Sequence, residues 1–225
     1  LLALQIGENA SSAVYAKAQQ KVAALLGIDY ELKILPQGTS QAEAENLIDD
    51  LNKDKFVTAI ILQLPVPKGI DGGRLSGFIS PAKDAEGMHP QNLGRILLGN
   101  YRTGPCSAMA AMELLESAGQ KLYGEEAVIV GHSEIVGKPL SLMLFNKFAT
   151  TTVCHIATGE RGLLADHVKR AEVLVVAVGK AGIIKGDWIR EGAIVIDVGI
   201  NKIFDHNLNK NIVHFLPRKH GSYYC

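Results

Sequence analysis

The segment from Ala127 to Pro139 joins an apolar strand-like run to a glycine-containing turn and then to an apolar helix-like run. Gly131 follows the strand-like residues 127–130, and Gly137 comes six residues later. A strand, a turn and a helix in this order form the first half of a nucleotide-binding βαβ unit, whose turn presents backbone N–H groups to a phosphate. Ser133 stands where the usual pattern has its middle glycine. An ordinary strand–turn–helix connection is therefore an equal alternative at this point.

Strand-like and helix-like segments alternate along most of the chain, which predicts an α/β fold with parallel sheets and right-handed crossovers. The predicted strands comprise residues 1–6, 30–35, 57–64, 127–130, 151–155, 173–178 and 194–198. We expect two lobes, of which the second has a Rossmann-like parallel sheet. The expected divisions are a first lobe at 1–104, a linking helix at 105–122, a nucleotide-binding lobe at 123–203 and an atypical tail at 204–225.

The overall charge and the cysteines exclude several classes of function. Basic and acidic residues number 23 each, so no net charge attracts nucleic acid or an anionic membrane. The apolar runs are too short to span a bilayer. The three widely spaced cysteines predict reduced thiols and do not have the spacing of metal ligands, so we expect no metal site. Leu1 already lies in a strand-like run, so we expect an N-terminal piece to precede it.

A helix is predicted after the first strand, with Ser11 or Ser12 as its N-cap. The apolar positions expected to pack into the core are Val14, Ala18, Val22, Leu25 and Leu26. Tyr15 and Gln19 are four residues apart, so their side chains are neighbours on one face of this helix.

Two polar features lie where an open α/β sheet binds ligands or connects its elements. Gln63 is the one amide at the carboxyl end of the predicted strand 57–64, where such sheets place their ligands. From these residues alone, a hydrogen bond to a loop is the favoured explanation of this glutamine. The loop 81–90 carries Asp84 and Glu86, which could bind a polar ligand, but a solvated connection is the favoured explanation of such a pair.

Nine short motifs, in order over residues 1–203, make the chain similar to the methylenetetrahydrofolate dehydrogenase/methenyltetrahydrofolate cyclohydrolase family. The motifs are S-x-x-Y at 12–15, Q-L-P at 63–65, K-D-x-x-G at 83–87, P-C at 105–106, G-x-S-x-I-V-G-K-P at 131–139, C-H at 154–155, V-V-A-V-G-K at 175–180, G-D-W-I at 186–189 and V-I-D-V-G-I-N at 195–201. Together they are far more specific than the glycine turn alone.

The resemblance implies two α/β lobes with folate in the cleft between them and a nicotinamide cofactor on the second lobe. It implies oxidation of 5,10-methylenetetrahydrofolate to the methenyl cation with NADP or NAD. Most members then add water and open the ring to 10-formyltetrahydrofolate. It also implies a homodimer formed through the second lobe.

The resemblance also assigns site residues. Tyr15 would lie against the folate, Gln63 would polarise groups near the reacting carbon, and position 19 would serve catalysis. The loop residues implied to bind the pterin include Lys83, Asp84 and Glu86. The residues implied to line the cofactor path are Gly131, His132, Ser133, Gly137, His155, Val178, Gly179 and Ile200.

Gln19 is the departure from the family pattern that bears most on activity. The family has a lysine here, implicated in cyclohydrolase chemistry, where a titratable amine can help to activate water. A glutamine amide does not titrate at neutral pH. Lys17 and Lys21 point some 160–200° away around the helix and do not replace it. We therefore expect weak or absent cyclohydrolase activity, with the dehydrogenase retained.

Other departures from the family pattern bear on the binding of folate and of the cofactor. Glu86 replaces the family aspartate, which keeps the charge but displaces the carboxylate by a methylene. His132 and Ile156 replace an arginine and a serine that serve the 2′-phosphate of NADP, so we favour NAD. Nothing after Asn201 resembles the family's closing segment.

These departures leave a competing function open. A non-catalytic, degenerate member could retain the fold and bind a nucleotide or a partner. An unrelated dinucleotide dehydrogenase would explain the second lobe but not the first. A cytoplasmic or a mitochondrial location is compatible with the sequence, because any targeting segment would lie before Leu1.

Overall fold

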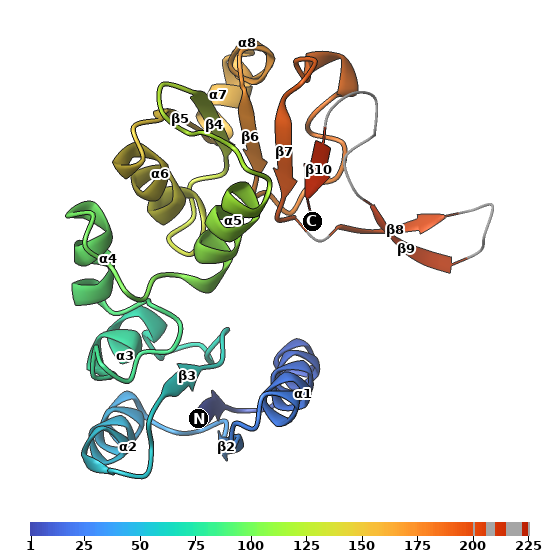
Figure 1. Cartoon of the computed structure of the whole chain (residues 1–225). Coiled ribbons are helices and arrows are strands. Elements are labelled where there is room, and N and C mark those ends of the chain that lie inside the picture. Colours follow the sequence, from blue (N-terminus) through green and yellow to red (C-terminus); the bar gives the residue numbers. More distant parts are fainter. Residues whose placement is uncertain (200, 206–209, 215–221, 225) are drawn as a thin grey trace. The chain divides into compact units, whose positions relative to one another are not determined.

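A computed structural model describes residues 1–199, 201–205, 210–214 and 222–224 of the chain (Figure 1). The chain divides into two compact units. The first comprises Leu1–Arg95 and Tyr101–Gly104, and the second comprises Ile96–Asn100 and Pro105–Cys225. Each unit is a mixed α/β structure with its own parallel sheet, as the alternation of segments predicted.

The first unit is built on a three-stranded parallel sheet in the order β2-β1-β3. Its elements are β1 (Leu2–Ile6), α1 (Ala10–Leu25), β2 (Glu31–Leu35), α2 (Gln41–Lys53), β3 (Ile60–Leu62) and α3 (Gly72–Phe78), and α4 (Pro90–Leu97) ends at the boundary. Because β2 and β3 flank β1 on opposite sides, right-handed crossovers place α1 and α2 on opposite faces of this sheet (Figure 1). Only three residues of the predicted strand 57–64 are a strand, since only they pair with β1.

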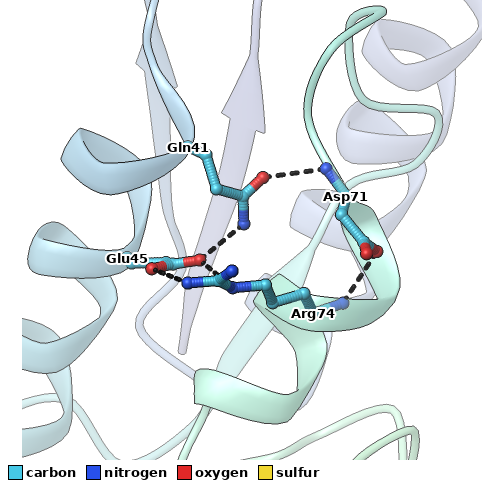
Figure 2. Close-up of polar contacts among 4 residues, drawn as sticks. All are labelled: Gln41, Glu45, Asp71 and Arg74. Carbon is cyan, nitrogen blue, oxygen red and sulfur yellow. Dashed lines mark hydrogen bonds and ion pairs between the residues drawn. The ribbon is translucent and has the colours of Figure 1, made fainter.

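The core of the first unit lies between α2 and the sheet. Ile48 of α2 is fully buried, as are Leu4, Ile60 and Leu75 of the elements around it. The polar side of α2 is joined to α3 by a network that Figure 2 shows. Gln41 donates to Glu45 at 2.7 Å, and Arg74 pairs with Glu45 at 2.6 Å. The hydrogen bond from Gln41, followed by Arg74, lowers the pKa of Glu45.

Helix α1 packs through a face that the hydrophobic pattern did not indicate. Val14 is 71% exposed and Leu25 is 77% exposed, so the predicted apolar stripe lies largely at the surface. The buried positions are instead Ser12, Ala16 and Ala23. Small side chains at this spacing let the helix approach the sheet closely. The predicted cap is also corrected, because the helix begins at Ala10 and Asn9 accepts a hydrogen bond from the Ser12 N–H at 3.1 Å.

The second unit contains a five-stranded parallel sheet in the order β10-β7-β6-β4-β5. Its strands are β4 (Glu126–Val130), β5 (Thr150–Cys154), β6 (Val173–Val176), β7 (Ile194–Asp197) and β10 (Ser222–Tyr224). Its helical elements are α5 (Cys106–Ser117), α6 (Gly137–Asn146), α7 (Ile156–Glu160), α8 (Leu164–Lys169) and the short 3₁₀ turn η1 (Gly186–Trp188). One face of the sheet packs Val128 and Leu174 against Val168 of α8. The four predicted strands of this lobe are confirmed.

The strand order creates a topological switch point between β4 and β6. After β4 the chain adds β5 on one side and then returns to add β6 on the other. Doubly wound sheets bind their ligands at the carboxyl ends of the strands that flank such a point. The glycine turn at Gly131 therefore lies where a nucleotide is expected.

The described part of the expected atypical tail contains strands. β8 (Asn201–Asp205) and β9 (Lys210–His214) form an antiparallel pair, and β10 adds to the edge of the large sheet beside β7. β10 forms because the edge of β7 offers it backbone hydrogen-bond partners, and the composition of the tail does not reveal such partners. Within the part of the chain that the structure describes, no helix is both long and apolar enough to cross a membrane.

We predict that a truncation in the buried core of the first unit destabilises the protein far more than one on the exposed face of α1. Ile48→Ala should lower the free energy of unfolding by about 2–5 kcal/mol, because it leaves a cavity in the core. Val14→Ala should change it by less than about 0.5 kcal/mol, since Val14 is at the surface. Urea denaturation would measure both, and equal losses would contradict this assignment of the two faces.

Candidate functional site

Ser12 joins the start of α1 to the segment that follows β3. Its buried hydroxyl donates to the Leu64 carbonyl at 3.1 Å. The contact couples the S-x-x-Y motif to the Q-L-P motif, although 52 residues separate the two partners. It holds Tyr15 and Gln19, which lie further along the helix, beside the carboxyl end of β3.

Gln19 is the centre of a hydrogen-bond cluster at this end of the sheet. Its side-chain oxygen accepts from Gln63 Nε2 at 2.7 Å and from the Tyr30 hydroxyl at 3.0 Å. Gln63 is 4% exposed. Burial raises the pKa of Tyr30 above its ordinary value of 10.0, so its hydroxyl keeps its proton at neutral pH. The sequence brought Gln19 and Gln63 forward but missed Tyr30. The only sequence signal for Tyr30 was its position at the start of the predicted strand 30–35.

Tyr15 lies one helical turn before Gln19 and lines the same groove. The groove has a volume of about 360 Å³ and is lined mostly by apolar side chains, among them Val22 and Ile61. Tyr15 itself is 62% exposed. An exposed aromatic ring beside an amide cluster suits a planar, polar-edged ligand.

The loop from Lys83 to Gly87 is attached to the same sheet. Asp84 forms a parallel bridge with Ile60 of β3, and its buried carboxylate accepts from the His89 N–H at 2.8 Å and from Asn92 at 2.9 Å. Because the bridge is parallel, the chain continues from Asp84 in the direction of Gln63. The loop therefore runs toward the Gln19 cluster.

Lys83, at the start of the loop, is attached to α2. Its ammonium donates to the Leu51 carbonyl at 2.8 Å and to the Asp54 carbonyl at 2.6 Å, at the carboxyl end of α2. Carbonyls at a helix end are natural partners for a cation. These bonds hold the start of the loop in place.

Glu86 carries the strongest electrostatic perturbation of the loop. Burial, and then the neighbouring Asp84 carboxylate, raises its pKa to about 7. A pKa in this range leaves a large share of Glu86 protonated near neutral pH. The next residue, Gly87, has a φ of 68°, and a Cβ there would lie 2.2 Å from the Gly104 backbone. Only glycine fits at this position.

The turn of the second unit is shaped by two glycines. A Cβ on Gly131 would lie 2.5 Å from the Ala177 carbonyl oxygen, and one on Gly137 would lie 2.0 Å from the Gly131 carbonyl oxygen. The hydroxyl of Ser133, in the place of the usual middle glycine, accepts from the Val136 N–H at 3.2 Å. Close packing of backbone at a strand–turn–helix junction is typical of turns that bind a pyrophosphate.

The remaining predicted cofactor residues come from the neighbouring strands. The His132 and His155 rings lie with their centroids 5.5 Å apart, in an edge-to-face arrangement. Val178 packs against the core just after β6, and Gly179 follows it. Ile200 lies outside the described residues. Over the described ranges, no three His, Cys, Asp or Glu side chains are grouped as metal ligands.

Two family models match the chain. The model described as tetrahydrofolate dehydrogenase/cyclohydrolase, catalytic domain, matches residues 1–86. The NAD(P)-binding domain of the same enzymes matches residues 105–214. The chain belongs to the tetrahydrofolate dehydrogenase/cyclohydrolase family. This confirms the family that the motifs indicated. The match continues to residue 214, which is beyond residue 203, where the motifs end.

Members of this family resemble the chain over nearly its whole length. The bifunctional protein FolD of Magnetococcus marinus is 41% identical over 99% of this chain and 77% of that protein. The crystal structure of Campylobacter jejuni FolD has a TM-score of 0.87 and 35% identity, over 94% of this chain and 73% of that one. Trypanosoma brucei FolD, complexed with NADP cofactor and inhibitor, has a TM-score of 0.88 and 32% identity, over 99% and 77% of the two chains. The chain thus spans about three quarters of these relatives.

We predict that Glu86 makes the stability of the protein depend on pH. Its folded pKa lies above its ordinary value of 4.5, so the stability associated with its proton is complete below about 4.5 and is lost as the pH rises through about 7. This loss should be about 3 kcal/mol. Glu86→Gln should abolish it in urea titrations across this range. Glu31→Gln, at an exposed position, should leave it intact, and an equal pH dependence in wild type and Glu86→Gln would contradict the assignment.

We predict that Gly137→Ala weakens nucleotide binding without unfolding the protein. The added methyl group would have to displace the Gly131 backbone, which costs about 1–3 kcal/mol and should raise the Kd for NAD by about tenfold. Gly159→Ala is the matched control, because a Cβ there would meet no atom within 4 Å. Calorimetric titration would measure both, and an unchanged Kd for Gly137→Ala would refute the proposed role of the turn.

Proposed function

We propose that this protein oxidises 5,10-methylenetetrahydrofolate to 5,10-methenyltetrahydrofolate, with NAD(P) as the hydride acceptor. The observation that carries the proposal is the convergence of Gln19, Gln63 and Tyr30 beside the exposed ring of Tyr15. These residues lie in the part of the chain that matches the family's catalytic domain. The glycine turn of the second unit supports the dinucleotide part of the proposal, because its backbone segments pack too closely for a side chain at Gly137, as in turns that bind a pyrophosphate.

In this proposal the residues of the first unit bind and align the folate. Tyr15 stacks on the planar pterin, and Gln63 is held by Gln19 with its amide toward the reacting groups. The bound nicotinamide supplies the chemistry of accepting a hydride from the methylene carbon. Such a transfer depends on alignment more than on a base, so a rigid amide cluster is sufficient for it.

We propose that cyclohydrolase activity is weak, because Gln19 cannot exchange a proton. Its oxygen already accepts two hydrogen bonds, and an amide neither activates water nor protonates a leaving group near neutral pH. Lys17 and Lys21 are exposed on other faces of α1. Water attack on the methenyl carbon, which would yield 10-formyltetrahydrofolate and a proton, therefore lacks a titratable partner at this position.

We further propose that NAD is preferred to NADP at neutral and alkaline pH. His132 follows the first glycine of the turn and Ile156 follows His155, so no fixed cation or hydroxyl occupies these positions. A 2′-phosphate there would lose a permanent charge-assisted hydrogen bond.

Paired assays test the proposed function. Methenyl formation from 5,10-methylenetetrahydrofolate is followed with NAD and with NADP near pH 8, and methenyl hydrolysis is followed separately. We expect dehydrogenase activity with a higher kcat/KM for NAD, and little hydrolysis above the uncatalysed rate. The absence of dehydrogenation with either cofactor would overturn the proposed function. A higher kcat/KM for NADP would overturn only the cofactor preference.

We predict that Gln19→Lys raises the rate of methenyl hydrolysis, by up to about 100-fold, because it introduces a titratable amine into the cluster. Gln20→Lys is the matched control, since it adds the same charge about 100° around the helix. The decay of methenyl absorbance measures both variants. Equal rates in the two would show that position 19 does not limit hydrolysis.

We also propose that the chain forms a homodimer. The proposal rests on the family resemblance. Sedimentation velocity tests it, and a single monomer boundary at micromolar concentration would refute it.

A further inference from the structure

Gln5 lies on the central strand of the first unit's sheet, on the face that α1 covers. Its neighbours along β1, Leu4 and Ile6, belong to the core on the α2 side. Because successive residues of a strand point to opposite faces, Gln5 is directed toward α1. Its side chain is 4% exposed, and a polar side chain buried this deeply needs hydrogen-bond partners.

One half of the Gln5 amide has a partner and the other half does not. The side-chain nitrogen donates to the Gly7 carbonyl at 2.9 Å, whereas the side-chain oxygen is buried with no hydrogen-bond partner. A backbone carbonyl accepts and cannot donate, so the nitrogen must face Gly7 and the oxygen must face away from it. An unpaired buried acceptor is destabilising, so this oxygen requires a donor.

The strand register makes Gln63 the neighbour of Gln5. Leu4 pairs with Leu62 in the parallel ladder between β1 and β3, and the Gln63 N–H donates to the Leu4 carbonyl at 2.8 Å. The next residues, Gln5 and Gln63, are therefore adjacent on strands about 4.8 Å apart. Gln63 also faces α1, since its amide donates to Gln19 of that helix. The two buried amides thus lie side by side under one helix.

The second N–H of Gln63 is the donor that this face of the sheet supplies. The Ser12 hydroxyl has a single hydrogen, which it donates to a backbone carbonyl at 3.1 Å. Ala3 and Ile61, which precede the two glutamines on this face, have apolar side chains. Gln63 gives one N–H to Gln19, and no hydrogen bond among the described residues uses the other.

We propose that Gln5 is a positioning residue, whose side-chain oxygen takes the second N–H of Gln63 when folate binds and thereby presents the Gln63 oxygen to the reacting carbon. With its two N–H groups held by Gln5 and Gln19, the Gln63 amide has only its oxygen left for the ligand. The opposite orientation would place two carbonyl oxygens against each other at Gln5. The inference rests on the proposed oxidation of 5,10-methylenetetrahydrofolate and adds a residue to it.

The orientation of the Gln63 amide matters because the reaction creates positive charge. As the methylene carbon loses its hydride to the bound nicotinamide, positive charge develops over that carbon and its two nitrogen neighbours. A carbonyl oxygen held in place before the reaction stabilises this charge, whereas an N–H directed at it opposes the charge. Gln5 therefore acts on the rate of hydride transfer and on the binding of the methenyl cation, and not on the binding of the uncharged methylene group.

Gln5→Met tests the proposal, because it removes the amide and keeps the length of the side chain. The dehydrogenase kcat should fall about tenfold, as the loss of one hydrogen bond would produce, with less than about a twofold change in the KM for folate. Rapid-mixing fluorescence without nucleotide measures binding before the methenyl cation hydrolyses. The Kd of 5,10-methenyltetrahydrofolate should rise about tenfold, and that of 5,10-methylenetetrahydrofolate should stay the same.

Two further variants separate positioning from stability. Gln41→Met removes the same amide from the α2–α3 network of the same unit (Figure 2), so it should leave kcat and both Kd values unchanged. In Gln5→Glu, a protonated carboxyl donates to Gly7 and still accepts from Gln63, and burial favours that protonated form. This variant should therefore retain the wild-type kcat and the wild-type ratio of the two Kd values.

A structure with bound folate supplies a test that needs no variant. The Gln5 oxygen should then lie about 2.7–3.2 Å from the Gln63 side-chain nitrogen, and a longer separation would overturn the proposal. An unchanged kcat in folded Gln5→Met, or equal losses of affinity for the cation and the substrate, would overturn it as well. So would a kcat loss of the same size in Gln41→Met, or a changed Kd ratio in folded Gln5→Glu.

Failure of this inference is distinguishable from failure of the proposed function. Each of the results above leaves folate binding and dehydrogenation by the wild type intact. If the wild-type chain binds neither folate, both the role of Gln5 and the proposed function are refuted.

Discussion

The close packing of backbone against backbone around Gly131 is the constraint on which the second unit depends. The Gly131 N–H is bonded to the end of β5, and the Ala177 N–H is bonded to the Val130 carbonyl. The end of β4 is thus fixed to both of its neighbours. A side chain at Gly131 or Gly137 would occupy the same space as a carbonyl oxygen. The turn at the switch point therefore has the close backbone packing that is typical of pyrophosphate-binding turns.

The first unit also depends on close packing, but there the small side chains of α1 produce it. Ser12, Ala16, Gln19 and Ala23 recur at spacings of four, three and four along α1, and three of them are buried. The alanines let the helix lie close to the sheet, while Ser12 and Gln19 bond to the segment that ends β3. One face of the helix therefore serves both packing and the candidate catalytic cluster.

The departures from the family pattern share a physical consequence. A neutral amide replaces an amine at Gln19, a carboxyl group with a pKa of about 7 stands at Glu86, and an imidazole stands at His132. No permanently charged side chain stands at any of these positions. In the proposed enzyme, binding at the first unit consequently responds to pH near neutrality through Glu86, whereas alignment of the ligands by backbone and by amides does not.

The sequence by itself determined the fold class, the family and the four strands of the second lobe, and it made Gln63 and the glycine turn candidates for the site. Hydrophobic alternation and short motifs are local signals, so they can be recognised from the sequence alone. Only the tertiary structure decided which face of α1 is buried. The apolar stripe at Val14 and Leu25 has the periodicity of a helix, but it does not say which segments pack against that helix. The same holds for Lys83 on the end of α2, for Tyr30 on Gln19, for the raised pKa of Glu86 and for the pairing of His132 with His155. Each depends on which distant segment lies alongside, and that is set by sheet order and backbone hydrogen bonds between strands far apart in the chain.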